Sequence, residues 1–387
     1  MFILEKPYVS ELLVDTIVQN DWPVLDNAVI EEAAIEEGAF TLWSDDDAKQ
    51  FYAKQEFPLI YSNSDNAISW IMTNLPQSNL ASYIKMFKDK ILFREMLKEL
   101  YPGFYFEAKE YDDLKNLKPD EIKYPVVLKP SVGFLSLGVH VIRNADDWKE
   151  AQNNLKKEVP NVKSVYSNNV LDSSKFIIEE LVEGEEYAID AYYDRNGEVS
   201  ILNIFRHPFF NEKDVSDRIY VTSAEIIIRY MAKFHQLIKR IGDLKNIRNL
   251  PIHMEVRVTQ DGTIIPIEVN PLRFAGWCTA DIAKYAWGIN AYEYYYRQRK
   301  PDWNDILERA GKKICYFSIV EVPPDVNKDT IKGFDYERFL ANYSNILELR
   351  RVNPRENLVF AVVLGSTENE AEIRRILSLK VKDYIRF

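Results

Sequence analysis

The sequence predicts a mixed α/β (α+β) protein that is divided into several subdomains. Three observations support this class. Strand-sized apolar runs alternate with amphipathic helical stretches along most of the chain. The length of 387 residues exceeds what one hydrophobic core usually holds. Between about 124 and 205, several strand-like runs follow one another at short intervals, which is typical of a sheet rich in antiparallel pairs.

The composition fits a compact protein and argues against several other classes. Hydrophobic residues make up 47% of the sequence, which is too many for a disordered chain. The longest apolar runs, such as 358–364, are strand-sized, so we expect no membrane span and no membrane partner. A net charge of −11 argues against nucleic acid as a partner. The first residues lack the pattern of a secretion signal, which predicts a cytoplasmic protein.

The order of the elements can be predicted from periodicity and turn signals. Short apolar strands within residues 1–82 are separated by amphipathic stretches, as in a small α/β lobe. Residues 83–100 repeat apolar positions at three and four and end before Tyr101-Pro102-Gly103, so they predict a single helix. Further strands are predicted at 124–129, 139–143, 176–181, 187–193 and 199–205, and further helices at 145–155, 223–242 and 278–298. The last segment, 313–387, is predicted to be a smaller α/β unit with two strands and two helices.

The predicted hairpin at 252–270 carries the most informative pattern of the chain. Asp261-Gly262 is a strong signal for a two-residue turn, with Gln260 facing Thr263. Because side chains alternate across a strand, this register separates a polar face from an apolar face. On the polar face, Glu255 faces Glu268 and His253 faces Asn270, with Arg257 beside them. The apolar face holds Met254, Val256, Val258, Ile265, Ile267 and Val269.

Two carboxylates that face each other on a sheet repel, so they require a proton, an arginine or a cation between them. Oxygen donors from Glu255, Glu268 and Asn270 suit magnesium, which prefers a few carboxylates together with substrate phosphates. The alternative interpretation is a solvated face whose glutamates are neutralised by Arg257.

A glycine- and serine-rich loop follows the predicted strand that ends in Lys129. Ser131, Gly133, Ser136 and Gly138 allow the backbone to approach phosphate oxygens closely. The loop connects two strands rather than a strand and a helix, so it is not a Walker loop. The alternative interpretation is an ordinary hairpin loop.

A cluster of glutamates surrounds Gly184, where an apolar strand ends. These side chains are suited to hydrogen bonds with an adenine edge and ribose hydroxyls. The alternative interpretation is that these glutamates follow the end of the strand and are simply exposed to water.

Taken together, these pieces resemble the ATP-grasp superfamily. The chain shows, in family order, a helix with DKxxFR, a strand that ends in lysine before a Gly/Ser loop, an EExxxGxE stretch, and paired acids that end in ExN. The resemblance implies an ATP-grasp fold. An N-terminal pre-ATP-grasp α/β domain (1–82) would precede two subdomains that clamp ATP (83–185 and 186–305), followed by a small C-terminal α/β segment (306–387).

The resemblance also implies roles for individual residues. Lys90 and Lys129 would contact ATP phosphates, and the loop that includes Ser131, Gly133, Ser136 and Gly138 would close over them. Glu179 and Glu180, with the backbone of Leu181 and Val182, would bind adenine, and Glu186 would hold the ribose.

Glu255, Glu268 and Asn270 would bind Mg²⁺, with Mn²⁺ as an alternative. His253 would contact the transferred phosphoryl group, and Arg273 and Gly276 would hold the substrate and the intermediate. In this chain Arg273 follows the ExN motif one place later than in the common form.

The activity that the resemblance implies is that of a carboxylate–amine ligase, as in L-amino acid ligases. Such an enzyme uses ATP and magnesium to activate a small carboxylate as an acyl phosphate and couples it to an amine. One alternative is another ATP-grasp reaction, carboxylation or phosphoryl transfer to a small metabolite. The other is a regulatory protein that binds ATP without consuming it. The sequence leaves the oligomeric state open; because many members are dimers, a homodimer is compatible with the resemblance.

Overall fold

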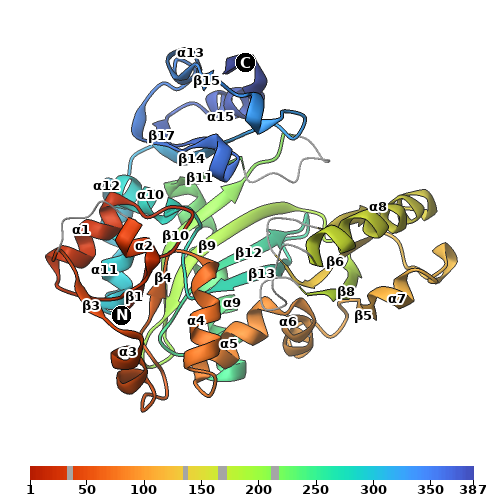
Figure 1. Cartoon of the computed structure of the whole chain (residues 1–387), viewed down its shortest axis with the longest axis horizontal. Coiled ribbons are helices and arrows are strands. Elements are labelled where there is room, and N and C mark those ends of the chain that lie inside the picture. Colours follow the sequence, from red (N-terminus) through yellow and green to blue (C-terminus); the bar gives the residue numbers. More distant parts are fainter. Residues whose placement is uncertain (33–37, 134–137, 164–171, 211–217) are drawn as a thin grey trace.

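The computed structural model describes residues 1–32, 38–133, 138–163, 172–210 and 218–387. Three lobes surround a central sheet (Figure 1). The N-terminal lobe lies at one end of the sheet, a lobe built from 103–180 projects to one side, and the C-terminal lobe lies above. The mixed α/β class that the sequence predicts is confirmed.

An antiparallel sheet of eight strands forms the centre of the molecule, and every neighbouring pair in it is antiparallel. Its strands, in spatial order, are β13 (Ile264–Pro271), β12 (Leu250–Val258), β9 (Glu185–Tyr193), β10 (Val199–His207), β11 (Ile219–Ser223), β14 (Ile314–Glu321), β17 (Val359–Thr367) and β16 (Ile346–Arg351). The predicted strands at 187–193 and 199–205 are confirmed as β9 and β10.

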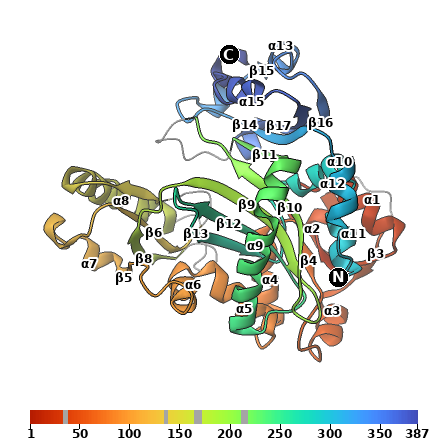
Figure 2. The same ribbon diagram turned by 180° about the vertical axis from the view of Figure 1, so that it is seen from behind.

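The two faces of this sheet have different roles. The long helix α9 (Ala224–Lys245) packs its buried residues, such as Phe234, on the face that carries Met254 and Val256. Figure 2 shows α9 in front of β9, β10 and β12. The opposite face carries the polar side chains of β12, because successive residues of a strand point to opposite sides.

The N-terminal lobe is a small parallel α/β unit. Its sheet has the order β3-β2-β1-β4, and each pair of neighbours is parallel. The strands are β1 (Phe2–Ile3), β2 (Pro23–Leu25), β3 (Thr41–Trp43) and β4 (Tyr61–Ser62), with α1 (Glu11–Gln19), α2 (Ala28–Glu32), α3 (Asp45–Tyr52), η1 (Asp65–Ala67) and α4 (Ile68–Asn74).

The single helix predicted at 83–100 is wrong, because the chain forms two helices there. α5 (Asn79–Lys88) and α6 (Lys90–Leu97) are separated at Asp89, whose backbone is extended with a ψ of 106°. The Asp89 carboxylate accepts hydrogen bonds from the amides of Ile91 and Leu92, and this caps α6. The break places Lys90 at the start of a helix that faces the sheet.

The projecting lobe contains a four-stranded antiparallel sheet of order β5-β8-β6-β7. Its elements are β5 (Phe106–Glu110), α7 (Tyr111–Leu114), η2 (Pro119–Glu121), β6 (Val126–Val132), β7 (His140–Ile142), α8 (Ala145–Lys163) and β8 (Asp172–Glu180). The strands predicted at 124–129, 139–143 and 176–181 are confirmed.

The helix predicted at 278–298 is also interrupted. The chain forms η3 (Thr279–Asp281), α10 (Ile282–Trp287) and α11 (Ala291–Tyr296), and α10 ends at Gly288. A further helix, α12 (Trp303–Arg309), leads to β14.

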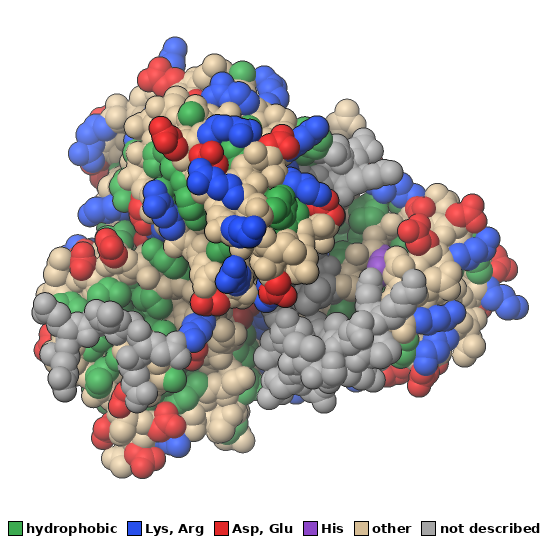
Figure 3. Space-filling view, turned by 45° about the horizontal axis from the view of Figure 1, so that its top comes forward, with side chains coloured by type: hydrophobic (Ala, Val, Ile, Leu, Met, Phe, Trp, Pro, Cys, Tyr) green, Lys and Arg blue, Asp and Glu red, His purple; other side chains and the backbone are tan. Residues whose placement is uncertain are grey.

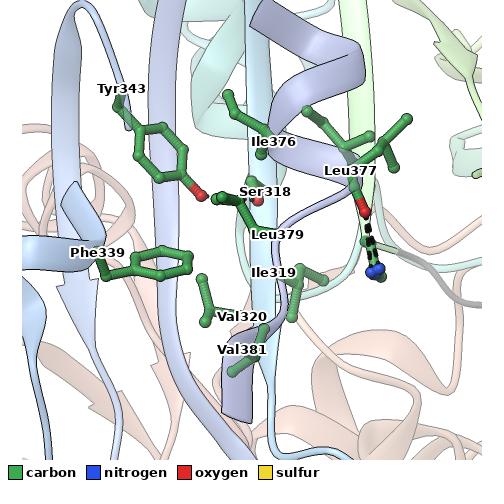
Figure 4. Close-up of a pocket in the computed structure, with 11 residues that line it drawn as sticks. Ser318, Ile319, Val320, Phe339, Tyr343, Ile376, Leu377, Leu379 and Val381 are labelled. Atoms are coloured by element: carbon green, nitrogen blue, oxygen red, sulfur yellow. Dashed lines mark hydrogen bonds between the residues drawn. The ribbon is translucent and has the colours of Figure 1, made fainter. Parts of the chain in front are cut away.

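The C-terminal lobe has more strands than the two that the sequence predicts, and three of them continue the central sheet. The additional elements are η4 (Lys328–Thr330), β15 (Gly333–Phe334), α13 (Tyr336–Leu340), α14 (Pro354–Asn357), α15 (Glu370–Leu377), η5 (Val381–Tyr384) and β18 (Ile385–Arg386). Within the lobe, Tyr343 and Ser318 point toward each other beside a cavity of about 20 Å³, enough for about one water (Figure 4). This cavity is too small for a substrate.

Candidate active site

The hairpin β12–β13 brings the predicted polar side chains together. Glu255 lies opposite Glu268 and His253 lies opposite Asn270, as the sequence predicts. The predicted two-residue turn is nevertheless wrong. The Thr259 amide donates to the Thr263 carbonyl at 2.9 Å, so the loop contains one more residue than expected.

A β-bulge restores the predicted register at the functional end of the hairpin. The pairing shifts by one residue next to Glu255, so that Val256 lies opposite Pro266 and Arg257 lies opposite Ile265. Ile265 therefore shares a face with Arg257, and its predicted place on the apolar face is wrong. The extra loop residue and the bulge cancel, which is why the acid pair was predicted correctly.

Two lysines, Lys88 at the end of α5 and Lys90 at the start of α6, lie beside Asn270 and Glu268. The Lys90 ammonium lies 3.7 Å from a Glu268 carboxylate oxygen. The Lys88 ammonium donates to the Asn270 amide oxygen at 3.1 Å. Burial raises the pKa of Glu268, but the positive charges of Lys90, Lys88 and Lys129 outweigh burial and hold this pKa below its usual range. The site thus keeps Glu268 ionised.

Lys129 lies in a buried ion-pair cluster. Its ammonium is 2.6 Å from one oxygen of Glu179, and the Arg94 guanidinium donates to the other oxygen at 2.7 Å. Burial raises the pKa of Glu179, but the two cations outweigh it and lower the pKa to about 2. Glu179, which the resemblance predicts to bind adenine, therefore also positions Lys129. Arg94 belongs to the DKxxFR motif, but sequence analysis assigned it no role.

The predicted adenine and ribose segment runs from β8 into β9. The Glu180 amide donates to Tyr105 and the Leu181 amide donates to Pro125, which ties the segment to the projecting lobe. Arg257 donates to the Val182 carbonyl and to Glu186. Arg257 is thus engaged at this segment, which weakens the interpretation in which it neutralises the acid pair.

The Glu186 carboxylate lies between the side chains of Arg257 and His207. One oxygen accepts from Arg257 at 2.9 Å, and the other is 2.9 Å from the His207 Nδ1 atom. Burial raises the pKa of Glu186, while His207 and Arg257 outweigh it and lower the pKa. Its carboxylate is ionised and oriented.

The Gly/Ser loop begins beside Lys90, whose ammonium donates to the Gly133 carbonyl at 3.3 Å. Ser131 is buried at the end of β6. Gly138 has a φ of +71°, and a Cβ there would lie 3.2 Å from the Pro130 ring, so glycine is favoured at this position. The predicted loop residue Ser136 lies outside the described residues.

His253 is held by a residue that sequence analysis missed. The Asp190 carboxylate lies 2.7 Å from His253 Nδ1, and the same oxygen accepts from the Ala275 amide at 2.9 Å. The His253 Nε2 atom is 3.8 Å from Glu255. An aspartate inside the otherwise apolar run of β9 is the sequence signal that could have indicated this role.

Arg273 is paired with Asp65 from the N-terminal lobe. The Arg273 Nε donates to Asp65 at 2.7 Å, and the Lys88 ammonium donates to the other oxygen at 2.8 Å. Burial raises the pKa of Asp65, but Arg273 and Lys88 outweigh it and hold this pKa well below its usual range. No local pattern indicates Asp65, because its partners are far away in sequence. Gly276 lies three residues beyond Arg273, and its carbonyl accepts from Thr279.

The donor set fits a magnesium ion that takes part of its coordination from phosphates. In the part of the chain that the structure describes, no group of three or more His, Cys, Asp or Glu residues forms a complete metal cage. Two opposed carboxylates and an amide oxygen supply only a few hard ligands, as magnesium prefers when it binds with a nucleotide. Glu255, Glu268 and Asn270 would hold it.

Residues 122–281, which include this hairpin and the glutamate segment, match the family model of the ATP-grasp domain. This chain contains an ATP-grasp domain. The matched range includes every predicted site residue except Lys90.

Solved structures share the fold of this protein over its whole length. The L-amino acid ligase from Bacillus licheniformis matches with a TM-score of 0.68 and 15% identity, covering 99% of this chain and 97% of that one. Biotin carboxylase from Campylobacter jejuni, solved as a beta-gamma-ATP complex, matches with a TM-score of 0.63 and 12% identity, covering 100% of this chain and 91% of that one. The N5-carboxyaminoimidazole ribonucleotide synthetase from Thermotoga maritima matches with a TM-score of 0.60 and 14% identity, covering 100% and 98%. A comparison with curated protein sequences finds no match.

The surface and the helices of this protein add two observations. Acidic and basic side chains are interspersed over the face shown in Figure 3. Among the described helices, none is long and apolar enough to cross a membrane.

Proposed function

We propose that this ATP-grasp protein is an ATP- and magnesium-dependent ligase that joins a small carboxylate, such as an amino acid, to an amine. The observation that carries the proposal is the opposed pair Glu255 and Glu268 beside the ammonium group of Lys90. This arrangement supports the proposal because it would supply metal ligands and a phosphate-binding cation in one place. The cytoplasmic location, the homodimer and the four-domain division remain predictions from the sequence.

The first step would transfer the γ-phosphoryl group of ATP to the substrate carboxylate. A carboxylate oxygen attacks the γ-phosphorus, the bond to the bridging oxygen of ADP breaks, and an acyl phosphate forms. Lys90 and Lys129 stabilise the charge on the phosphates, and His253 contacts the transferred group. Magnesium, when bound, supplies Lewis-acid stabilisation of the same charge. Glu186 and the segment around Leu181 and Val182 orient the nucleoside.

The second step would form the amide. The amine nitrogen attacks the acyl carbon, the carbon–oxygen bond to phosphate breaks, and the amine proton leaves with the phosphate. Arg273 holds the anionic group of the substrate, and the Gly/Ser loop that begins at Gly133 excludes water, which would otherwise hydrolyse the acyl phosphate. Catalysis then rests on positioning and electrostatics, without a covalent enzyme intermediate.

The fold alone does not separate ligation from the other ATP-grasp reactions, because the carboxylases found above share it. These reactions differ in whether ADP and phosphate are released and in which substrates that release requires. Amide ligation releases ADP and phosphate only when carboxylate and amine are both present. Carboxylation requires bicarbonate. A kinase releases ADP and keeps the phosphate on its product, and a regulatory protein releases neither.

The test is an incubation of the purified protein with ATP and magnesium against a panel of amino acids and other small carboxylates, singly and in pairs, with and without bicarbonate. ADP and phosphate are both measured. We expect release that depends on a pair of substrates and is lost in Glu268→Gln. Release that requires bicarbonate would instead assign a carboxylase, and ATP binding without release from any combination would assign the regulatory function.

A further inference from the structure

The loop that follows β13 has an unfavourable backbone that something must hold in place. This 273–281 loop carries Arg273 and Gly276, the residues proposed to hold the substrate. Trp277 and Cys278 both adopt the left-handed conformation, with φ values of 57° and 52°. Residues with a Cβ avoid this region unless the surroundings stabilise it.

The stabilising group comes from the C-terminal lobe. Arg350 on β16 is 3% exposed, and its Nη1 atom donates to the carbonyls of Trp277 at 2.6 Å and Cys278 at 3.1 Å. These are the carbonyls of the two left-handed residues. The Nη2 atom of Arg350 donates at 2.7 Å to Asp281, at the other end of the loop.

Asp281 and the Arg350 guanidinium are themselves held by further contacts. Asp281 is buried, and its second oxygen accepts from the Tyr292 hydroxyl. The Nε atom of Arg350 donates to Glu348 at 2.6 Å, and the guanidinium lies 5.1 Å from the ring centre of Tyr8. The planar guanidinium thus connects the C-terminal lobe, the N-terminal lobe and the loop, which a lysine ammonium would not do with the same geometry.

The opposite end of the loop is tied to the proposed catalytic histidine. The Ala275 amide and His253 Nδ1 share one oxygen of Asp190. The Thr279 amide and hydroxyl both donate to the Gly276 carbonyl, which closes a turn between the two ends. A change at 277–278 is therefore transmitted through a short, hydrogen-bonded turn to Gly276 and Ala275.

We propose that Arg350 is a positioning residue, and that it holds the 273–281 loop in the conformation that presents Arg273 and Gly276 to the substrate. The inference deepens the proposed ligase function and rests on it for its catalytic part. The structural part, the restraint of the loop by Arg350, can be tested without any substrate.

Cys278 provides the substrate-free measurement, because its thiol is buried within the restrained segment. Burial raises its pKa to about 11, so the restrained thiol reacts slowly. The only other cysteine, Cys315, is replaced by serine in every protein used in this experiment. The rate of alkylation of Cys278 by iodoacetamide is then compared between Arg350→Met and Arg218→Met. Arg218 is the matched control, because it also donates to a backbone carbonyl of the C-terminal lobe, that of Leu377, but does not contact the loop.

We expect alkylation to accelerate by about 100-fold in Arg350→Met and to stay within about threefold in Arg218→Met, because loss of a buried ion-pair partner makes local opening easier. If the unpaired Asp281 carboxylate prevents Arg350→Met from folding, the double variant Arg350→Met with Asp281→Asn is measured instead, because it removes both charges. Millimolar guanidinium added to Arg350→Ala should slow alkylation again. An unchanged rate in every folded variant would overturn the restraint.

The catalytic part is tested on the same variants once a substrate pair is identified. We expect kcat to fall at least tenfold in Arg350→Met while the KM for ATP stays unchanged, and guanidinium to restore part of kcat in Arg350→Ala. Faster alkylation with an unchanged kcat would overturn the positioning role. If the parent protein ligates no pair at all, the proposed function fails, and the alkylation rates still decide whether Arg350 restrains the loop.

Discussion

At the residue scale, three acids of the site have lysine or arginine side chains beside them. Glu268 lies near Lys90, Glu179 lies between Lys129 and Arg94, and Asp65 lies between Lys88 and Arg273, all buried or partly buried. Buried carboxylates are costly unless they are paired, so these pairings keep the acids ionised. In the proposed function, they would also hold Lys90 and Lys129 in position to contact the phosphates of ATP.

Replacing Glu268 with glutamine should remove a metal ligand while keeping the shape of the side chain. We expect kcat for ATP-dependent ligation to fall by about 100-fold or more, because a catalytic metal contributes several kcal/mol. Calorimetry should show weaker binding of ATP with magnesium. Glu95→Gln is the matched control, because Glu95 is exposed on α6 and pairs with Lys98. Equal activity of the two variants would contradict the metal assignment.

The Glu179 cluster predicts how stability depends on pH. The pKa of Glu179 is lowered to about 2 in the folded chain, against an ordinary value of 4.5. A lowered pKa stabilises the fold at pH values above 4.5, and this contribution disappears as the pH falls toward 2. We expect Glu179→Gln to lose about 3 kcal/mol of unfolding free energy at pH 7. The loss, measured by urea unfolding, should shrink below about pH 4.5. A loss that is constant with pH would refute this account of the ion pairs.

At the element scale, the hairpin β12–β13 shows why local patterns predict some features and not others. Alternation and a turn signal predicted that Glu255 faces Glu268, although the loop is longer and a bulge compensates. Bulges leave little trace in sequence, so this compensation could not be predicted. The break at Asp89 was predictable in principle, because aspartate is a strong N-cap residue, but the apolar periodicity on both sides favoured one helix.

Gly184, between the predicted adenine segment and Glu186, gives a prediction at this scale. Its φ is +147°, and a Cβ would lie 2.3 Å from the Val258 carbonyl oxygen. We expect Gly184→Ala to push the start of β9 away from the end of β12 and to weaken ATP binding by about tenfold or more, since misplaced binding groups are costly. Gly103→Ala is the control, because the added methyl meets nothing within 4 Å. Equilibrium binding of ATP to both variants is the measurement, and equal affinities would contradict this role of the segment.

At the scale of the whole molecule, the site combines side chains from lobes that are far apart in sequence. Asp65 comes from the N-terminal lobe, Asp190 from the central sheet and Arg350 from the C-terminal lobe. The sequence predicted the parts that recur as short ordered motifs, such as the strand that carries Lys129 and the ExN end of the hairpin. The predicted end of that strand is wrong, because β6 continues past Lys129 to Val132. Asp65, Asp190 and Arg350 were missed because their roles depend on long-range packing, which no local pattern encodes.

The central claim is that a carboxylate is activated as an acyl phosphate, and oxygen transfer tests it most directly. A substrate carboxylate labelled with ¹⁸O is incubated with its amine partner, ATP and magnesium, and the released phosphate is analysed by mass spectrometry. The account predicts one ¹⁸O atom in each phosphate, because the oxygen that attacks the γ-phosphorus leaves with it. Phosphate without ¹⁸O from the carboxylate, formed together with the amide, would contradict an acyl phosphate intermediate.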